Sequence, residues 1–352
     1  MNWYPAFSRW TQANRWFWSA LAVAILWLVL SVVTNRFSIA SLSGILLSAS
    51  FLTIVGLGQM FVVTTGRGNI DLSIPSVITL NAYLALLTIQ GVDANLVVGV
   101  PVAIGVGLLV GGFNAMLVVM LRIPAIIATL ASGYVLATAT LLANSAISGF
   151  AVSGVLKAIA GGRVYGIPVM VMVAIVCVAA ASFVLRFTAY GQMLAAVGQN
   201  RAAARLAGIK TGAVIATAFL ISSVLASCTG LVLGAYVGGA FLEMGQPYLL
   251  QSVAAVVVGG TLIFGGAATA VGTFIASVLL ILIVTTMQIM GLPPGTQDMV
   301  QGVVVILVLA LASRDSAVPQ IRKAFDAPPP QGEADGNPHN KIVPGGTSII
   351  DG

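Results

Sequence analysis

The chain has 352 residues, of which 59% are hydrophobic and only 7% are charged. Soluble globular proteins carry about 25% charged residues, so this composition excludes an ordinary soluble domain and indicates a polytopic membrane protein. The net charge is +6, but the basic residues stand between apolar runs, which favours a role in membrane topology over nucleic-acid binding.

Apolar runs alternate with short polar segments along most of the chain. A helix that crosses the hydrocarbon core needs about 20 apolar residues, and we expect ten such helices in an all-α fold. The first run is not followed by a small-residue cleavage site, so we expect an uncleaved span after a cytoplasmic N-terminus, residues 1–16. The predicted spans cover residues 17–34, 42–64, 74–90, 95–121, 124–143, 168–185, 213–235, 249–263, 269–290 and 298–312.

The distribution of Lys and Arg predicts the orientation. With the N-terminus inside, twelve of these residues fall on the cytoplasmic side, and three, Arg36, Lys157 and Arg163, fall outside. This bias follows the positive-inside rule and predicts that both termini are cytoplasmic. The transmembrane domain is then 17–312, and the segment 186–211 is its longest cytoplasmic interruption.

Three further segments lie outside the predicted spans. The external segment 144–167 is long and partly apolar, and we expect a short helix there at the membrane interface. The segment 236–248 is expected to be a second external loop. Residues 313–352 are rich in Pro and Gly and are expected to form a disordered cytoplasmic tail.

The segment 65–75, Thr-Gly-Arg-Gly-Asn-Ile-Asp-Leu-Ser-Ile-Pro, separates the second and third spans. Gly66 and Gly68 are expected to end the helix before it. Asp71 or Ser73 can cap the next helix, with Pro75 near its first turn. A capped turn between two spans explains these residues without any further role.

The segment 186–211 carries four basic residues and no acid. A helix over 191–197 is expected to end at Gly198, and Asn200 is expected to cap a second helix that ends at Gly208. Arg201 and Arg205 then share one face, where like charges repel. Either this face meets an acidic partner or anionic lipid headgroups, or the arginines only enforce topology.

Glycines also recur where helices are expected to pack closely. Two Gly pairs in the segment 259–273 bracket a short turn, and no Lys accompanies them as a phosphate loop requires. The spacing of four residues in Gly107/Gly111 and in Gly230/Gly234/Gly238 favours packing within the chain, although a subunit interface is the alternative.

The spans contain no obvious energy-converting group. No acid or base lies securely at the middle of a span, and there is no paired carboxylate, His/Cys metal cluster or phosphate loop. We therefore expect no catalytic residue, no metal site and no cofactor in this chain, which would not be an enzyme. It is either a passive pore or a membrane subunit driven by a partner.

Three ordered motifs resemble one family, the permeases of ABC importers for monosaccharides of the ribose, xylose and galactose type. They are the segments 65–75, 198–209 and 259–273, and the similarity covers about residues 40–312. The motif at 65–75 departs from the family pattern at Arg67-Gly68-Asn69 and Ile74-Pro75. The residues that we assign to the motifs are Gly66, Gly68, Asn69, Asp71, Leu72 and Ser73 in the first and Gly198, Asn200, Arg201, Ala204, Arg205, Gly208 and Ile209 in the second.

The resemblance implies that the segment 186–211 is a coupling loop that docks on an ATP-binding subunit. It also implies a second permease chain, identical or related, a periplasmic sugar-binding protein, and a place in the bacterial inner membrane. ATP and Mg would be bound by the partner subunit. The alternatives are a stand-alone channel and a permease for branched-chain amino acids.

Polar uncharged residues within spans are the candidates for a sugar path, because they form hydrogen bonds without the desolvation cost of a charge. The alternative for each is a hydrogen bond between helices, worth about 0.6 kcal/mol. The candidates are Gln59, Asn81, Asn114, Ser132, Tyr134, Gln251 and Gln288.

Overall fold

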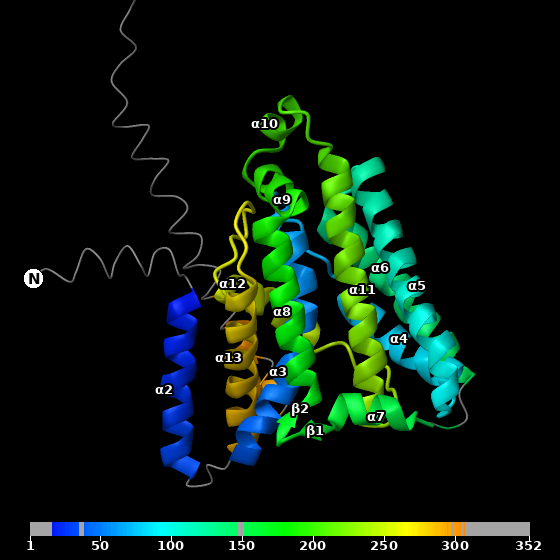
Figure 1. Ribbon diagram of the computed structural model, residues 1–352, viewed down its shortest axis with the longest axis vertical. Coiled ribbons are helices and arrows are strands. Elements are labelled where there is room, and N and C mark those ends of the chain that lie inside the picture. Colours follow the sequence, from blue (N-terminus) through cyan, green and yellow to red (C-terminus); the bar gives the residue numbers. More distant parts are fainter. Residues whose placement is uncertain are drawn as a thin grey trace, which may run out of the picture. The chain divides into compact units, whose positions relative to one another are not determined.

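The computed structural model describes residues 16–34, 39–146, 149, 151–293, 295–297, 299–303 and 306. These residues are mostly helical and contain a single short two-stranded sheet, which confirms the predicted all-α class for the described part of the chain. The helices form a bundle with α9 and α10 at one end and α7, β1 and β2 at the other (Figure 1). The elements are α2 (Trp16–Thr34), α3 (Ile39–Thr64), α4 (Ile74–Ile89), α5 (Leu96–Ala115), α6 (Ala125–Ser145), α7 (Gly154–Gly161), β1 (Arg163–Val164), β2 (Ile167–Pro168), α8 (Val169–Phe187), α9 (Ala189–Gln199), α10 (Arg201–Leu206), α11 (Thr211–Val237), α12 (Tyr248–Val258) and α13 (Ala270–Ile289).

Nine of the ten predicted spans overlap a helix. In the part of the chain that the structure describes, six helical segments are long and apolar enough to cross a membrane, and they include α3, α5, α6, α8, α11 and α13. Three apolar helical segments are shorter: Ser19–Leu28, α4 and α12. The predicted tenth span, 298–312, lies mostly outside the described residues, and the predicted tail, 313–352, lies wholly outside them.

Two long helices, α3 and α11, form the centre of the bundle. A β-carbon placed on Gly58 of α3 would lie 2.9 Å from the Cα atom of Ser222 in α11, so glycine permits this crossing. In the most apolar stretch of α3, 89% of the residues are buried. The same share is 28% in the segment that contains α5 and 28% in α8. The outer helices expose apolar side chains such as Val97 and Leu109, as expected for surfaces that face lipid.

The helices α4 and α12 are too short to cross a bilayer. At about 1.5 Å per residue, their 16 and 11 residues extend about 24 Å and about 17 Å, against a hydrocarbon core of about 30 Å. The last third of the predicted span 249–263 is wrong, because α12 ends at Val258 and the chain turns at Gly259 and Gly260. Non-helical segments, 65–73 and 238–247, precede the two short helices.

The segment 238–247 differs from the expected external loop because part of it enters the bundle. The backbone N–H of Gly245 donates a hydrogen bond to Thr79 Oγ1 in α4, at 3.0 Å. Met244 is 3% exposed, and a β-carbon on Gly245 would overlap the carbonyl group of Pro75. This close approach fixes the start of α12 against the first turn of α4.

The predicted short helix in the segment 144–167 is confirmed as α7. Ser153 is its N-cap and accepts a hydrogen bond from the backbone N–H of Leu156. A two-stranded ribbon follows, with Arg163 paired to Pro168 and Val164 paired to Ile167. The ribbon leads directly into α8.

The predicted packing role is confirmed for Gly107, Gly111 and Gly230, whereas Gly238 has nothing within 4 Å of a β-carbon and instead ends α11 with a φ angle of 80°. Gly107 and Gly111 of α5 meet the backbone of α11, and Gly230 of α11 meets the backbone of Ile78 in α4. Each contact leaves no room for a β-carbon without a shift of the neighbouring helix.

Gly230→Ala is expected to destabilise the chain, because its β-carbon would lie less than 3.0 Å from the carbonyl group of Ile78. Overpacking of this kind costs about 1–3 kcal/mol. The matched control is Gly112→Ala in α5, where a β-carbon meets nothing within 4 Å. Thermal unfolding in detergent should show a lower Tm for Gly230→Ala only; an equal Tm for both variants would contradict the packing account.

Candidate functional site

The segment 65–73 leaves α3 through three consecutive left-handed residues. The φ angles are 75° at Gly66, 60° at Arg67 and 70° at Gly68. A β-carbon on Gly66 would also lie 2.7 Å from the carbonyl oxygen of Phe264 and 2.8 Å from that of Gly198. The predicted helix break at Gly66 and Gly68 is confirmed, and Gly66 is required both for its φ angle and for close approach.

Asp71 is the polar centre of this segment. It is 2% exposed. Its Oδ1 atom accepts hydrogen bonds from the backbone N–H and the hydroxyl of Ser73, at 3.0 and 2.6 Å. Its Oδ2 atom accepts a hydrogen bond from Ser222 Oγ in α11, at 2.8 Å. The backbone N–H of Asp71 donates to Gln59 Oε1 in α3, at 3.2 Å. Ser73 is the N-cap residue of α4, as expected, but its side chain makes no capping bond.

Hydrogen bonds also join the segment to α5 and α6. Asn114 Nδ2 donates to Ser73 Oγ at 2.9 Å, and Ser132 Oγ donates to Asn114 Oδ1 at 2.6 Å. The backbone N–H of Leu72 donates to Thr129 Oγ1 at 2.9 Å. Within the segment, Asn69 Nδ2 donates to Thr65 Oγ1 at 2.8 Å. The buried backbone is therefore held by side chains of α3, α5, α6 and α11.

Asp93, at the opposite end of α4, makes similar bonds in a different environment. Its Oδ1 atom accepts hydrogen bonds from Ser153 Oγ, at 2.5 Å, and from the backbone N–H of Val155, at 3.1 Å. The Ser153 hydroxyl, followed by the Val155 N–H, holds the pKa of this exposed carboxyl below its usual value of 3.8. Asp93 therefore fastens the start of α7 while it remains in contact with water.

The predicted helices of the segment 186–211 are confirmed with one correction. Asn200 Oδ1 accepts hydrogen bonds from the backbone N–H groups of Ala202 and Ala203 and so caps α10. Gly208 has a φ angle of 81°, as a helix-terminating glycine should. However, α9 continues through Gly198 to Gln199. Gly198 instead permits close contact, because a β-carbon there would overlap the carbonyl oxygen of Thr64.

The two arginines of α10 do not form one outward face. Arg201 is half-buried, and its Nη2 atom donates hydrogen bonds to the carbonyl oxygens of Thr65 and Gly66, both at 3.1 Å. Arg205 is exposed, and its Nε atom donates to Thr211 Oγ1 at 3.1 Å. Among the other predicted coupling residues, Ala204 is buried and Ile209 is half-buried. Leu206, which the sequence analysis did not single out, is 91% exposed.

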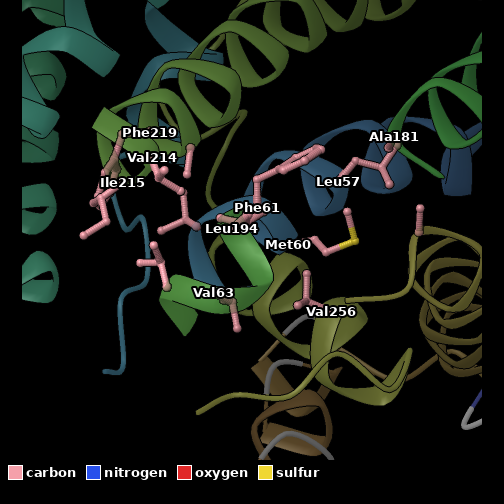
Figure 2. Close-up of a cluster of buried hydrophobic side chains, with 14 of the residues drawn as sticks. Leu57, Met60, Phe61, Val63, Ala181, Leu194, Val214, Ile215, Phe219 and Val256 are labelled. Carbon is pink, nitrogen blue, oxygen red and sulfur yellow. The ribbon is translucent and has the colours of Figure 1, made fainter. Parts of the chain in front are cut away.

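Buried side chains anchor the base of this loop. Leu194 of α9 is 0% exposed and packs in a cluster with residues of α3 and α11. Figure 2 shows Leu194 next to Phe61 and near Val214 and Phe219. α9 is therefore part of the core, whereas α10 projects beyond the bundle (Figure 1).

The candidate path residues fall into two groups. Gln59, Asn81 and Asn114 are 0% exposed, and Gln251 is 6% exposed, so these four offer no open surface. Gln251 Nε2 donates to Gln301 Oε1 at 2.8 Å, and Asn81 Nδ2 donates to the carbonyl oxygen of Val77 at 3.1 Å. Tyr134 and Gln288 are exposed.

A cavity of about 160 Å³ lies between the first turns of α4, the middle of α6 and the segment 238–247. Sequence reasoning missed this site, since most of its polar side chains are single Ser or Thr residues in apolar helices. Tyr134 shares a face of α6 with two of the lining residues, at a spacing of three and seven residues. The lining residues are Pro75, Ser76, Thr79, Ala137, Thr140, Leu141, Leu242 and Gln246.

No group of three or more His, Cys, Asp or Glu side chains is placed to hold a metal ion within the described part of the chain. The two cysteines, Cys177 and Cys228, are free and half-buried. The polar site is thus built from hydroxyl, amide and carboxyl groups and from one guanidinium.

Asp71→Ala is expected to lower the Tm in detergent, because it removes the acceptor of three buried hydrogen bonds. Each buried donor left unsatisfied costs about 1–3 kcal/mol. Asp71→Asn keeps one carbonyl acceptor and should lie between Asp71→Ala and the unmodified chain. Asp93→Ala is the matched control, since Asp93 itself is exposed and water can reach the backbone N–H of the exposed Val155. If Asp93→Ala lowers the Tm as much as Asp71→Ala, burial is not what makes Asp71 important.

Comparison with known proteins shows which family the chain belongs to. The family model described as branched-chain amino acid transport system / permease component matches residues 41–309. The chain is 32% identical over 304 residues to the autoinducer 2 import system permease protein LsrC of Enterobacter sp. (strain 638), covering 86% of this chain and 87% of that protein.

It is also 30% identical over 301 residues to the ribose import permease protein RbsC of Escherichia coli (strain K12), covering 84% of this chain and 93% of that protein. The corresponding protein of Haemophilus influenzae is 30% identical over 299 residues. No solved structure matches the chain significantly. The relatives are transport permeases and not enzymes, and the resemblance found in the motifs is confirmed. The chain therefore belongs to the family of branched-chain amino acid transport system permease components, within which it is similar to ribose and autoinducer 2 import permeases.

Proposed function

We propose that this chain is the membrane subunit of an ATP-driven importer that carries a monosaccharide or a related small polyol. Its relatives with ribose and autoinducer 2 in their names favour this substrate class over branched-chain amino acids. The proposal includes ten spans, of which α4 and α12 cross together with the non-helical segments 65–73 and 238–247 that precede them. It also includes cytoplasmic termini and the bacterial inner membrane as its location. A periplasmic sugar-binding protein delivers the substrate, and a second permease chain, identical or related, completes the path.

The observation that carries the proposal is the exposed helix α10. It has six residues, projects from one end of the bundle and presents Leu206 with 91% of its surface exposed. An exposed leucine close to Arg205 and Lys210 suits docking on a partner whose surface offers an apolar contact and acidic groups. We assign this surface to the ATP-binding subunit, which would hold ATP and Mg.

The cavity beside α4 is the proposed part of the sugar path. Its polar groups, from Ser76, Thr79, Thr140 and Gln246, form hydrogen bonds with hydroxyl groups and carry no charge. Leu141 and Leu242 are exposed at its edge, so the cavity opens to the surface of the chain. This open side is where the second permease chain would complete the path. Weak polar contacts suit a subunit that must release its substrate.

Leu206→Asp is expected to abolish co-purification of a co-expressed ATP-binding subunit, because a carboxylate replaces the apolar contact. The matched control is Tyr165→Asp, which changes a fully exposed residue between β1 and β2, at the other end of the bundle. A pull-down from detergent with both variants checks the prediction. Equal recovery of the subunit with Leu206→Asp would exclude α10 as the docking surface.

Gln246→Leu is expected to reduce uptake of labelled ribose about tenfold while the complex still assembles, since one lost hydrogen bond to the substrate is worth about 1.5 kcal/mol. Gln288→Leu is the matched control, as Gln288 is exposed on α13 and does not line the cavity. If Gln288→Leu reduces uptake and Gln246→Leu does not, the path lies elsewhere.

A further inference from the structure

We propose that Arg201 is a positioning residue that transmits movement of α10 to the segment 65–73 and from there to the cavity beside α4. This inference rests on the proposed function, because it gives the docking helix a physical connection to the sugar path. It assigns to Arg201 a role inside the chain, separate from docking.

The first step is the contact between α10 and the broken helix. One guanidinium nitrogen, Arg201 Nη2, bonds to two successive carbonyl oxygens, those of Thr65 and Gly66, at 3.1 Å each. Hydrogen bonds from a charged donor are stronger than those between neutral groups. The Nε atom of Arg201 is also buried, and no described group accepts from it. The side chain of Arg201 therefore points into the bundle, whereas that of Arg205 is exposed.

The second step is that close backbone contacts surround this pair. The backbone N–H of Gly266, in the loop between α12 and α13, donates to the carbonyl oxygen of Thr64 at 3.1 Å. β-carbons on Gly66 or Gly198 would collide with neighbouring backbone atoms. If α10 moves along the direction of the Arg201 hydrogen bonds, Thr65 and Gly66 therefore move with it, and no gap opens between α10 and the segment 65–73.

The third step runs along the segment itself. Its far end, at Asp71 and Ser73, bonds to α11 and α5, and it leads directly into Pro75, Ser76 and Thr79 of the cavity wall. Only the residues 67–74 separate the carbonyl group of Gly66, to which Arg201 bonds, from Pro75 in the cavity wall. Because most of this segment is not helical, it can change its dihedral angles without breaking a ladder of helix hydrogen bonds.

The charge of Arg201 has a cost that its bonds must offset. Burial, followed by the nearby Arg67 and Arg205, lowers the pKa of Arg201 to about 10. The guanidinium stays charged at neutral pH. A lysine in the same place would experience the same burial and the same two cations, so its pKa would fall below its usual value of about 10.4.

The test measures the cavity wall directly and needs no sugar. In a background with Cys177→Ser and Cys228→Ser, Ser76→Cys is labelled with a maleimide in the complex with the ATP-binding subunit, with and without ATP and vanadate. We expect trapping to change the labelling rate at least about fivefold, which is the size of a coupling of about 1 kcal/mol. Arg201→Ala should reduce this change to less than about twofold while the subunit still co-purifies and hydrolyses ATP.

Two variants separate transmission from a merely structural role. Arg205→Ala should keep the full change in labelling rate. Arg201→Lys keeps a charged donor for the carbonyl oxygens of Thr65 and Gly66 and should restore the change in labelling rate at least in part.

Several results would overturn the inference. They are an unchanged labelling response in Arg201→Ala or the absence of any response in the unmodified complex. Loss of assembly in Arg201→Ala without any recovery of the response in Arg201→Lys would reduce Arg201 to a structural residue. Failure of the unmodified chain to bind any ATP-binding subunit would instead refute the proposed function.

Discussion

The requirement that buried backbone groups be hydrogen-bonded organises this structure. A non-helical segment inside an apolar bundle exposes N–H and C=O groups that neither lipid nor helix geometry satisfies. Residues 65–73 form such a segment, and side chains of five helices meet it. Gln59, Thr129 and Arg201 bond to its backbone, and Asn114 and Ser222 bond to its side chains. The buried polar groups of Gln59, Asn114, Thr129 and Ser222 therefore satisfy hydrogen bonds of this segment.

The burial of Asp71 costs free energy, and its hydrogen bonds fix the positions of the surrounding helices. A buried carboxyl group costs free energy unless its oxygens receive hydrogen bonds, and here Ser73 and Ser222 supply them. Because Ser222 lies in α11 at its crossing with α3, the same bonds fix the register of the two central helices. The short helix α4 then begins at a defined place, and its first turn becomes one wall of the cavity. Arg201 connects the same segment to the end of the bundle where α10 is exposed.

Periodicity and turn chemistry in the sequence predict the elements well. Apolar runs locate nine described helices, and the Asn200 cap and the glycines at 66, 68 and 208 behave as their chemistry requires. The role of Gly198 could not be predicted, since close approach to Thr64 depends on a residue 134 positions away. For the same reason Arg201 and Arg205 looked equivalent, although tertiary contacts turn one inward. The entry of the segment 238–247 into the bundle was also hidden, because its Gly and Pro residues and its one acid, Glu243, resemble those of an external loop.

The central claim is that transport through this chain is driven by a partner and is not passive. The most direct measurement places the purified chain in liposomes, with and without its ATP-binding subunit and binding protein, and follows labelled ribose. The account predicts accumulation against a gradient only when both partners and ATP are present, and no entry through the chain alone. Equilibration of ribose through the chain alone, without ATP or partners, would contradict it and identify the chain as a channel.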